Sequence, residues 1–121
     1  MRAVVQRTTG ASVTVEGAIV GEIGRGLVVF LGVEEGDTTQ DLLYICDKVT
    51  GLRVFDDENE IPNLSVLDIA GSVLLVSQFT LCADARKGKR PSYIKAARPE
   101  QAIPLYEAAI ARIRASVPVQ H

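Results

Sequence analysis

The segment that decides the fold is SVLLVSQFT, residues 72–80. Residues 73–76 of this segment are four consecutive apolar residues, and such a run is typical of a strand buried on both faces. Side chains that follow a buried strand inherit its rigid backbone, which a preorganised site requires. We therefore predict a polar site at the rim of a sheet, formed by Ser77, Gln78, Phe79 and Thr80. A strand end capped by Ser and Thr is the structural alternative.

The length and composition predict one compact domain over residues 1–121. Of the residues, 47% are hydrophobic and 23% are charged, and no apolar run approaches the roughly 20 residues of a membrane span. Cys46 and Cys82 form no CxxC motif, so we expect both to be reduced in a cytoplasmic protein.

The only histidine is His121, the last residue, where a mobile chain end cannot hold an imidazole in a catalytic position. A Ser-His-Asp or Cys-His hydrolase needs an oriented imidazole, and a zinc site without histidine needs clustered cysteines or carboxylates. We therefore expect catalysis without metal or cofactor, using another proton acceptor or one supplied by the substrate.

The basic residues are unevenly distributed although the net charge is only −2. Six of the thirteen lie in residues 86–98, a stretch without any acid: Arg86, Lys87, Lys89, Arg90, Lys95 and Arg98. A basic loop on an acidic body can bind a few phosphates and still repel non-cognate polyanions. A solvated surface loop would have the same composition.

Periodicity and turn residues predict the remaining elements. Strands are expected at residues 1–8, 12–15, 18–23, 27–33, 52–55 and 72–78, with a hairpin turn at Glu16 and Gly17. One helix is expected to be capped by Asp37 with Gln40 and to end at Gly51. Its apolar face comprises Leu42, Leu43, Ile45, Cys46 and Val49.

A second helix is expected from Pro104 toward Ser116, since a proline deep in a helix costs about 3 kcal/mol. Its core stripe comprises Ile103, Tyr106, Ile110, Ile113 and Val117. There are too few alternating units for a doubly wound sheet. We predict an α+β fold: a curved, barrel-like mixed sheet with two helices on the outside.

The segment SQFTL, residues 77–81, resembles the SQxT motif of D-aminoacyl-tRNA deacylases, the D-tyrosyl-tRNA(Tyr) deacylase family, which hydrolyse D-amino acids from tRNA. Further segments resemble the family in the same order: VQR at 5–7, ASVTV at 11–15, GLV at 26–28, LGV at 31–33 and GKRPSY at 88–93. Agreement of a motif with its context is stronger than a lone SQxT. The resemblance implies hydrolysis of the aminoacyl ester at the tRNA 3′ end by a homodimer with its active site near the interface.

The resemblance also implies roles for the polar cluster. The backbone at Phe79 and Thr80 would contact the oxyanion, Gln78 would hold the substrate, and Ser77 would orient the loop. The Thr80 hydroxyl is alternatively a nucleophile, although the sequence offers no evident base to activate it.

Basic residues outside this cluster would contact other parts of the substrate site. Arg7 would anchor the pocket, unless it is a surface residue that ends a strand. The phosphates of the acceptor stem would be bound by Arg86, Lys87, Lys89 and Arg90.

The sequence departs from the family in one respect. The family carries a second signature, a Gly-Pro pair that enters the neighbouring subunit's pocket, and this chain contains no Gly-Pro dipeptide. We therefore expect a domain that is short at its C-terminal end. The alternative to an active enzyme is a non-catalytic remnant that acts as a tRNA-binding or dimerisation module.

Overall fold

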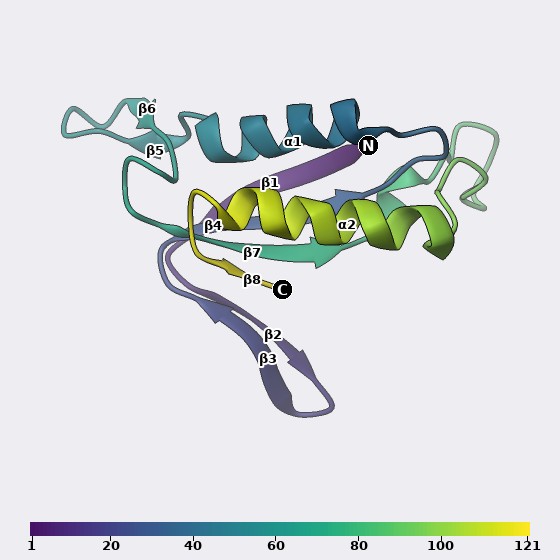
Figure 1. Cartoon of the computed structure of the whole chain (residues 1–121), viewed down its shortest axis with the longest axis horizontal. Coiled ribbons are helices and arrows are strands. Elements are labelled where there is room, and N and C mark those ends of the chain that lie inside the picture. Colours follow the sequence, from purple (N-terminus) through teal and green to yellow (C-terminus); the bar gives the residue numbers. More distant parts are fainter.

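A four-stranded sheet forms the centre of the computed structural model, which describes residues 1–121 (Figure 1). Its strands, in spatial order, are β1 (Arg2–Thr8), β4 (Gly26–Gly32), β7 (Ser72–Ser77) and β8 (Val119–Gln120). β1 is antiparallel to β4, whereas β7 is parallel to β4 and β8 is parallel to β7. The mixed sheet therefore has the apolar segment at residues 72–76 in its interior, as predicted.

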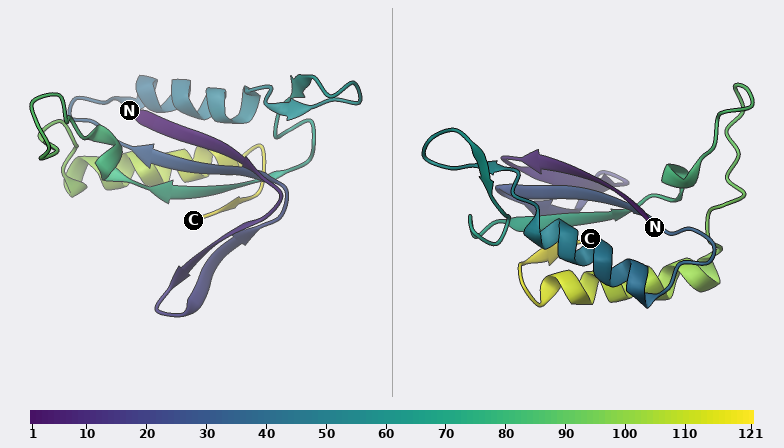
Figure 2. Two further views of the ribbon diagram at one scale, coloured as in Figure 1. Left: turned by 180° about the vertical axis from the view of Figure 1, so that it is seen from behind. Right: turned by 90° about the horizontal axis from the view of Figure 1, so that it is seen from above.

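Two helices cover one face of this sheet, α1 (Thr39–Gly51) and α2 (Pro99–Arg114) (Figure 2). The core lies between the helices and the sheet. It contains Leu27, Val29 and Leu31 of β4, Val73 and Leu75 of β7, Leu42, Cys46 and Val49 of α1, and Ala109, Ile110 and Ile113 of α2. The alternation along β4 and β7 follows from the strand period of two, which directs every second side chain toward the helices.

Two short hairpins complete the fold. The hairpin of β2 (Ala11–Val15) and β3 (Ala18–Ile23) extends away from the body (Figure 1). Its turn has φ values of 50° at Glu16 and 81° at Gly17, the left-handed pair that a tight hairpin requires. β5 (Phe55–Asp56) and β6 (Pro62–Leu64) form the other hairpin.

The mixed α+β class and the two helices are confirmed, but the sheet is not a closed barrel. β1 and β8 are its edges, and the hairpins form separate sheets. Both helices lie on the outside of the sheet, as predicted, and both pack on the same face (Figure 2). Neither helix has the length and apolar character needed to cross a membrane.

The cap predicted for α1 is wrong by one residue. Thr38 is the N-cap, and its backbone N–H and hydroxyl both donate to Asp41 Oδ2, at 2.8 and 3.2 Å. Asp37 accepts instead from the Met1 ammonium and from the Glu34 N–H, both at 2.7 Å. Asp37, which the local pattern predicted as the helix cap, therefore binds the N-terminal ammonium of the chain instead.

The Asp41 carboxylate makes the stability of α1 dependent on pH. The hydrogen bond from the Thr38 backbone, together with that from its hydroxyl, lowers the pKa of Asp41 from its ordinary value of 3.8. This contribution is present above pH 3.8 and is lost as the pH falls through the lowered pKa. We expect Asp41→Ala to lower the thermal midpoint at pH 7 and to have a smaller effect near pH 3. An equal effect at both pH values, measured by circular dichroism, would contradict this prediction.

The predicted start of the second helix is also wrong, since α2 begins at Pro99 and contains Pro104. Pro99 suits the first position because its fixed φ is helical and its missing N–H would have no partner there. Arg98 before it is extended, with φ −70° and ψ 158°, as a residue preceding proline prefers. Ile103 is 53% exposed and does not belong to the core stripe, whereas Ile110, Ile113 and Val117 are buried.

Of the residues predicted to form a strand at 52–55, only Phe55 lies in one. β5 comprises Phe55 and Asp56 only, and it pairs with β6, which the sequence pattern did not reveal.

Cys46 and Cys82 are both buried and free, and burial raises the pKa of Cys46 to about 11. Burial also raises the pKa of Cys82, so both thiols are protonated at neutral pH.

Candidate active site

The four predicted residues lie at the end of β7, at the rim of the sheet, and Ser77 is the last residue of the strand. Ser77 pairs with Leu31 of β4, and the Gln78 N–H donates to the Leu31 carbonyl at 2.8 Å. The chain then turns into the short 3₁₀ helix η1 (Phe79–Cys82). β4 and β7 are the two inner strands, so the position of this turn is fixed from within the sheet.

Side chains of the motif interact across the turn. Gln78 Nε2 donates a hydrogen bond to Thr80 Oγ1. The Gln78 carbonyl accepts from Leu81 N–H at 3.3 Å, and the Thr80 carbonyl accepts from Ala83 N–H at 3.2 Å. Gln78 and Thr80 are half-buried, whereas Ser77 and Phe79 are exposed. The partner of the Thr80 hydroxyl is an amide donor, which cannot remove its proton.

Gly32 allows η1 to pack closely against the end of β4. A Cβ at this position would lie 3.0 Å from the Gln78 carbonyl oxygen, 3.1 Å from Leu81 Cβ and 3.2 Å from Cys82 Sγ. The contact with Gln78 involves backbone, which has little freedom to move. The glycine at residue 32 thus holds the turn close to the strand.

Arg2 supports the same turn, and the sequence analysis did not identify it. Arg2 Nε lies 2.6 Å from Glu34 Oε1, and Arg2 Nη1 donates to the Leu81 carbonyl at 3.3 Å. The hydrogen bond from Arg2 lowers the pKa of Glu34. Arg2 reaches the turn because it pairs with Gly32 in the β1–β4 register, and no local motif predicts that long-range pairing.

Arg7 lies at the opposite end of the sheet. It pairs with Leu27 near the start of β4, whereas Ser77 pairs with Leu31 near the end. Its guanidinium donates to the Val54 carbonyl at 2.9 Å and lies 3.7 Å from Asp56. The chain therefore does not bring Arg7 together with the Ser77–Thr80 cluster.

The basic loop lies on the same side as η1 and projects from the body before α2 (Figure 2). Asp84 and Ser92 close its base through two backbone hydrogen bonds of 2.8 Å. Arg86 is bound to Asp84, with Nη2 to Oδ2 at 2.6 Å, and this hydrogen bond holds the pKa of Asp84 far below its usual range. The other predicted phosphate contacts are exposed and form no ion pair: Lys87, Lys89 and Arg90.

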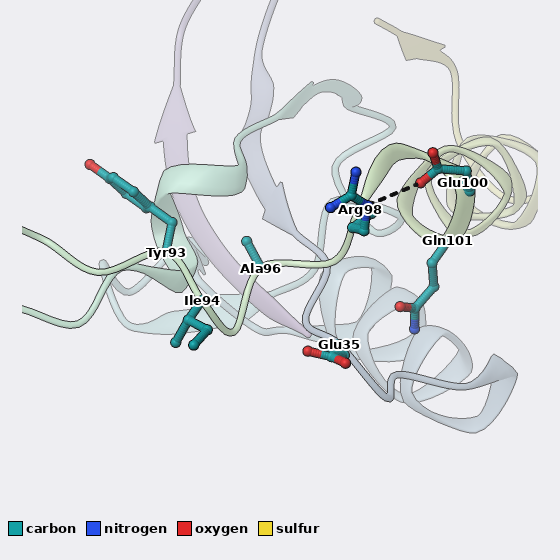
Figure 3. Close-up of a pocket in the computed structure, with 7 residues that line it drawn as sticks. All are labelled: Glu35, Tyr93, Ile94, Ala96, Arg98, Glu100 and Gln101. Atoms are coloured by element: carbon teal, nitrogen blue, oxygen red, sulfur yellow. Dashed lines mark ion pairs between the residues drawn. The ribbon is translucent and has the colours of Figure 1, made fainter.

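A cavity of about 550 Å³ lies between this loop and the start of α2 (Figure 3). Its lining includes Glu35, Tyr93, Ile94, Arg98 and Gln101. The ring of Tyr93 contacts Phe79 of η1, with centroids 5.5 Å apart at an angle of 62°. Figure 3 shows the Tyr93 ring pointing away from the other lining residues, so the aromatic pair lies beside the cavity.

No three histidine, cysteine or acidic side chains converge in an arrangement that would hold a metal ion. The rim presents hydrogen-bond donors on a fixed backbone, next to a projecting basic loop.

Known proteins resemble this chain over most of its length. A D-aminoacyl-tRNA deacylase of Koribacter versatilis is 60% identical over 115 residues, covering 95% of this chain and 77% of that protein. One from Bacillus licheniformis is 58% identical, covering 88% of this chain and 73% of that protein. The solved structure of the c-Myc DNA Unwinding Element Binding Protein superposes with a TM-score of 0.91 at 39% identity, over 98% of this chain and 83% of that one.

A probable eukaryotic D-amino acid tRNA deacylase superposes with a TM-score of 0.77 at 17% identity, covering 94% of this chain and 67% of that one, and supports the fold alone. The sequence model of the D-Tyr-tRNA(Tyr) deacylase family matches residues 4–121, which include the SQFT turn and the basic loop. On these matches, the chain belongs to the D-Tyr-tRNA(Tyr) deacylase family.

Proposed function

We propose that this protein hydrolyses the ester bond of D-aminoacyl-tRNA, releasing the free D-amino acid and tRNA and so proofreading chirality in translation. The observation that carries the proposal is the SQFT turn, fixed at the end of an inner strand in a chain 60% identical to a D-aminoacyl-tRNA deacylase. The single hydrophobic core supports treating residues 1–121 as one domain. A role in translation implies a cytoplasmic protein.

The reaction suits a site that has no histidine. An aminoacyl ester is already activated, and the neighbouring ribose 2′-hydroxyl can carry a proton, so that water attacks the carbonyl and the ribose oxygen leaves. The first N–H groups of a 3₁₀ turn have no acceptor within the turn, so those of Phe79 and Thr80 are available to a developing oxyanion. Gln78 holds the substrate, and Ser77 orients the turn.

Thr80 has a positioning role in this mechanism. Its hydroxyl accepts a hydrogen bond from Gln78, and no side-chain base contacts it. Thr80→Val keeps the branched shape but removes the hydroxyl. We expect this variant to retain substantial activity, within about tenfold of the wild type, because a neutral hydrogen bond contributes about 1 kcal/mol. Complete loss, measured as single-turnover release of D-tyrosine, would instead identify Thr80 as the nucleophile.

We further propose that the enzyme is a homodimer with its active site near the interface. The sheet face opposite the helices carries Val4, 48% exposed, and the hairpin carries Val15, Ile19 and Val20, at least half exposed. Such apolar surface favours contact with a second copy. Arg7 is too far along the sheet to join the cluster of its own chain, so a role for it in a site requires the cluster of a second copy. We also propose that the central sheet is curved like part of a barrel.

The proposal extends to the acceptor stem of tRNA. Lys87, Lys89 and Arg90 are unpaired and exposed on the projecting loop, which supports contact with phosphates. Arg86 can join them only by exchanging its bond to Asp84 for one to RNA.

The decisive experiment measures release of labelled tyrosine from D-tyrosyl-tRNA and L-tyrosyl-tRNA by the purified chain. We expect release from the D form and none from the L form, with less release by a Thr80→Ala variant. Release from neither substrate would refute the proposal and favour a tRNA-binding or dimerisation module without catalysis.

A further inference from the structure

Phe79 and Tyr93 form an exposed aromatic pair beside the site. They come from separate segments, η1 and the basic loop, yet their rings lie 5.5 Å apart. Phe79 is 58% exposed and Tyr93 is 41% exposed, so the pair contributes little to the core. Tyr44 on α1 is the only other comparably exposed aromatic residue, and it lies against Lys48 of its own helix.

The backbone on both sides of Tyr93 is anchored. Before it, Ser92 exchanges two hydrogen bonds with Asp84. After it, the Lys95 carbonyl accepts from Glu35 N–H at 2.8 Å, and Ala97 N–H donates to the Val33 carbonyl at 2.9 Å. These bonds tie the Tyr93 segment to the end of β4, so the ring is held beside Phe79 by the fold.

The pair joins the candidate ester site to the basic loop, because Phe79 belongs to the first and Tyr93 to the second. Phe79 is flanked directly by Gln78 and Thr80, and Tyr93 follows Lys89 and Arg90 on its own loop. An aminoacyl-tRNA bound with its ester at Thr80 and its stem phosphates on the loop must pass its last unpaired nucleotides over this region. Aromatic side chains are the usual platforms on which single-stranded bases stack.

The adjoining cavity is suited to a base and unsuited to a phosphate. Its volume of about 550 Å³ falls within the usual range for small-molecule sites. Ile94, 79% exposed, supplies an apolar wall, whereas Glu35 and Glu100 would repel a phosphate. The only guanidinium in its lining, that of Arg98, lies 3.8 Å from Glu100 (Figure 3).

We infer that Phe79 and Tyr93 form a stacking platform for a nucleobase that precedes the terminal adenosine of tRNA. The inference rests on the proposed function and adds a subsite to it. Tyr93 contributes affinity for the RNA and takes no part in breaking the ester. Since stacking needs an aromatic face and no hydroxyl, phenylalanine serves at residue 93 as well as tyrosine.

The test compares Tyr93→Leu, Tyr93→Phe and the matched control Tyr44→Leu on two substrates. One is D-tyrosyl-tRNA, and the other is 3′-O-D-tyrosyl-adenosine, which lacks the preceding nucleotides. We expect Tyr93→Leu to raise KM for the tRNA substrate about tenfold without changing kcat, and to leave cleavage of the adenosine ester unchanged. Tyr93→Phe and Tyr44→Leu should behave as wild type. An unchanged KM for the tRNA, or an equal loss on both substrates, would overturn the inference.

A binding measurement separates this inference from the proposed activity. Fluorescence anisotropy gives the affinity of each variant for a labelled ACCA oligoribonucleotide, and circular dichroism confirms that each variant is folded. A tenfold weaker affinity in Tyr93→Leu alone would support the platform even if the wild type cleaved neither ester, a result that would refute only the activity. Equal affinity in all variants would overturn the platform.

Discussion

Gly26→Ala is expected to destabilise the protein more than any other substitution considered for this chain. A Cβ at residue 26 would overlap the Ser72 carbonyl oxygen and would lie 2.8 Å from both the carbonyl carbon and the backbone nitrogen of Ser72. These are backbone atoms of the strand with which Gly26 pairs, so they cannot move without breaking the β4–β7 ladder. We expect the free energy of unfolding to fall by about 3 kcal/mol or more.

Gly24→Ala provides the matched control. It lies two residues away, and a Cβ there would meet nothing within 4 Å. We expect a change within about 0.5 kcal/mol, as for an ordinary surface substitution. Urea unfolding followed by circular dichroism measures both variants. Similar midpoints for the two would show that β4 and β7 do not approach one another as closely as described.

Gln78→Ala is expected to have the largest effect on activity. The substitution removes the amide that binds the Thr80 hydroxyl and, in the proposed mechanism, the group that holds the substrate. Loss of one preorganised contact at a reacting carbonyl typically costs about 100-fold or more in rate. We therefore expect kcat/KM for D-tyrosyl-tRNA to fall by about 100-fold while the protein remains folded.

Gln40→Ala, an exposed glutamine at the start of α1, is the control for this variant. Its activity should equal that of the wild type. Gln78→Glu distinguishes loss of the donor from loss of the side chain, because it keeps the shape and replaces the amide with a carboxylate. If Gln78→Ala retained nearly full activity, the role assigned to Gln78 would be wrong, whatever the outcome for Thr80.

Local patterns predicted those parts of the fold whose signal lies within a few neighbouring residues. The hairpin turn at Glu16 and Gly17 and the strand before Ser77 are both confirmed. α2 was misplaced because the cost of Pro104 was given more weight than the suitability of Pro99 for the first turn. A proline in the second turn removes a single hydrogen bond, and packing of the remaining helix compensates for it.

The surroundings of the site depended on pairings that no local pattern reveals. Arg2 supports η1 because β1 runs antiparallel to β4, and Asp37 binds the Met1 ammonium because the same register brings the terminus beside it. Arg7 could be assigned from a motif, but its distance from the cluster became evident only when β1 was paired. The chemical groups were predictable from sequence, whereas their relative placement was not.

The parallel pairing of β4 with β7 has a consequence for folding kinetics. Gly26 and Ser72 meet only after the intervening chain, including α1 and the β5–β6 hairpin, has formed a crossover. Closing this long loop costs conformational entropy before the contacts between β4 and β7 can form. We therefore expect this ladder to form late and to limit the folding rate. The SQFT turn begins where that ladder ends. Partly folded molecules in which α1 and the hairpins are already formed would therefore lack the site altogether, and activity should appear only in the last kinetic phase of refolding.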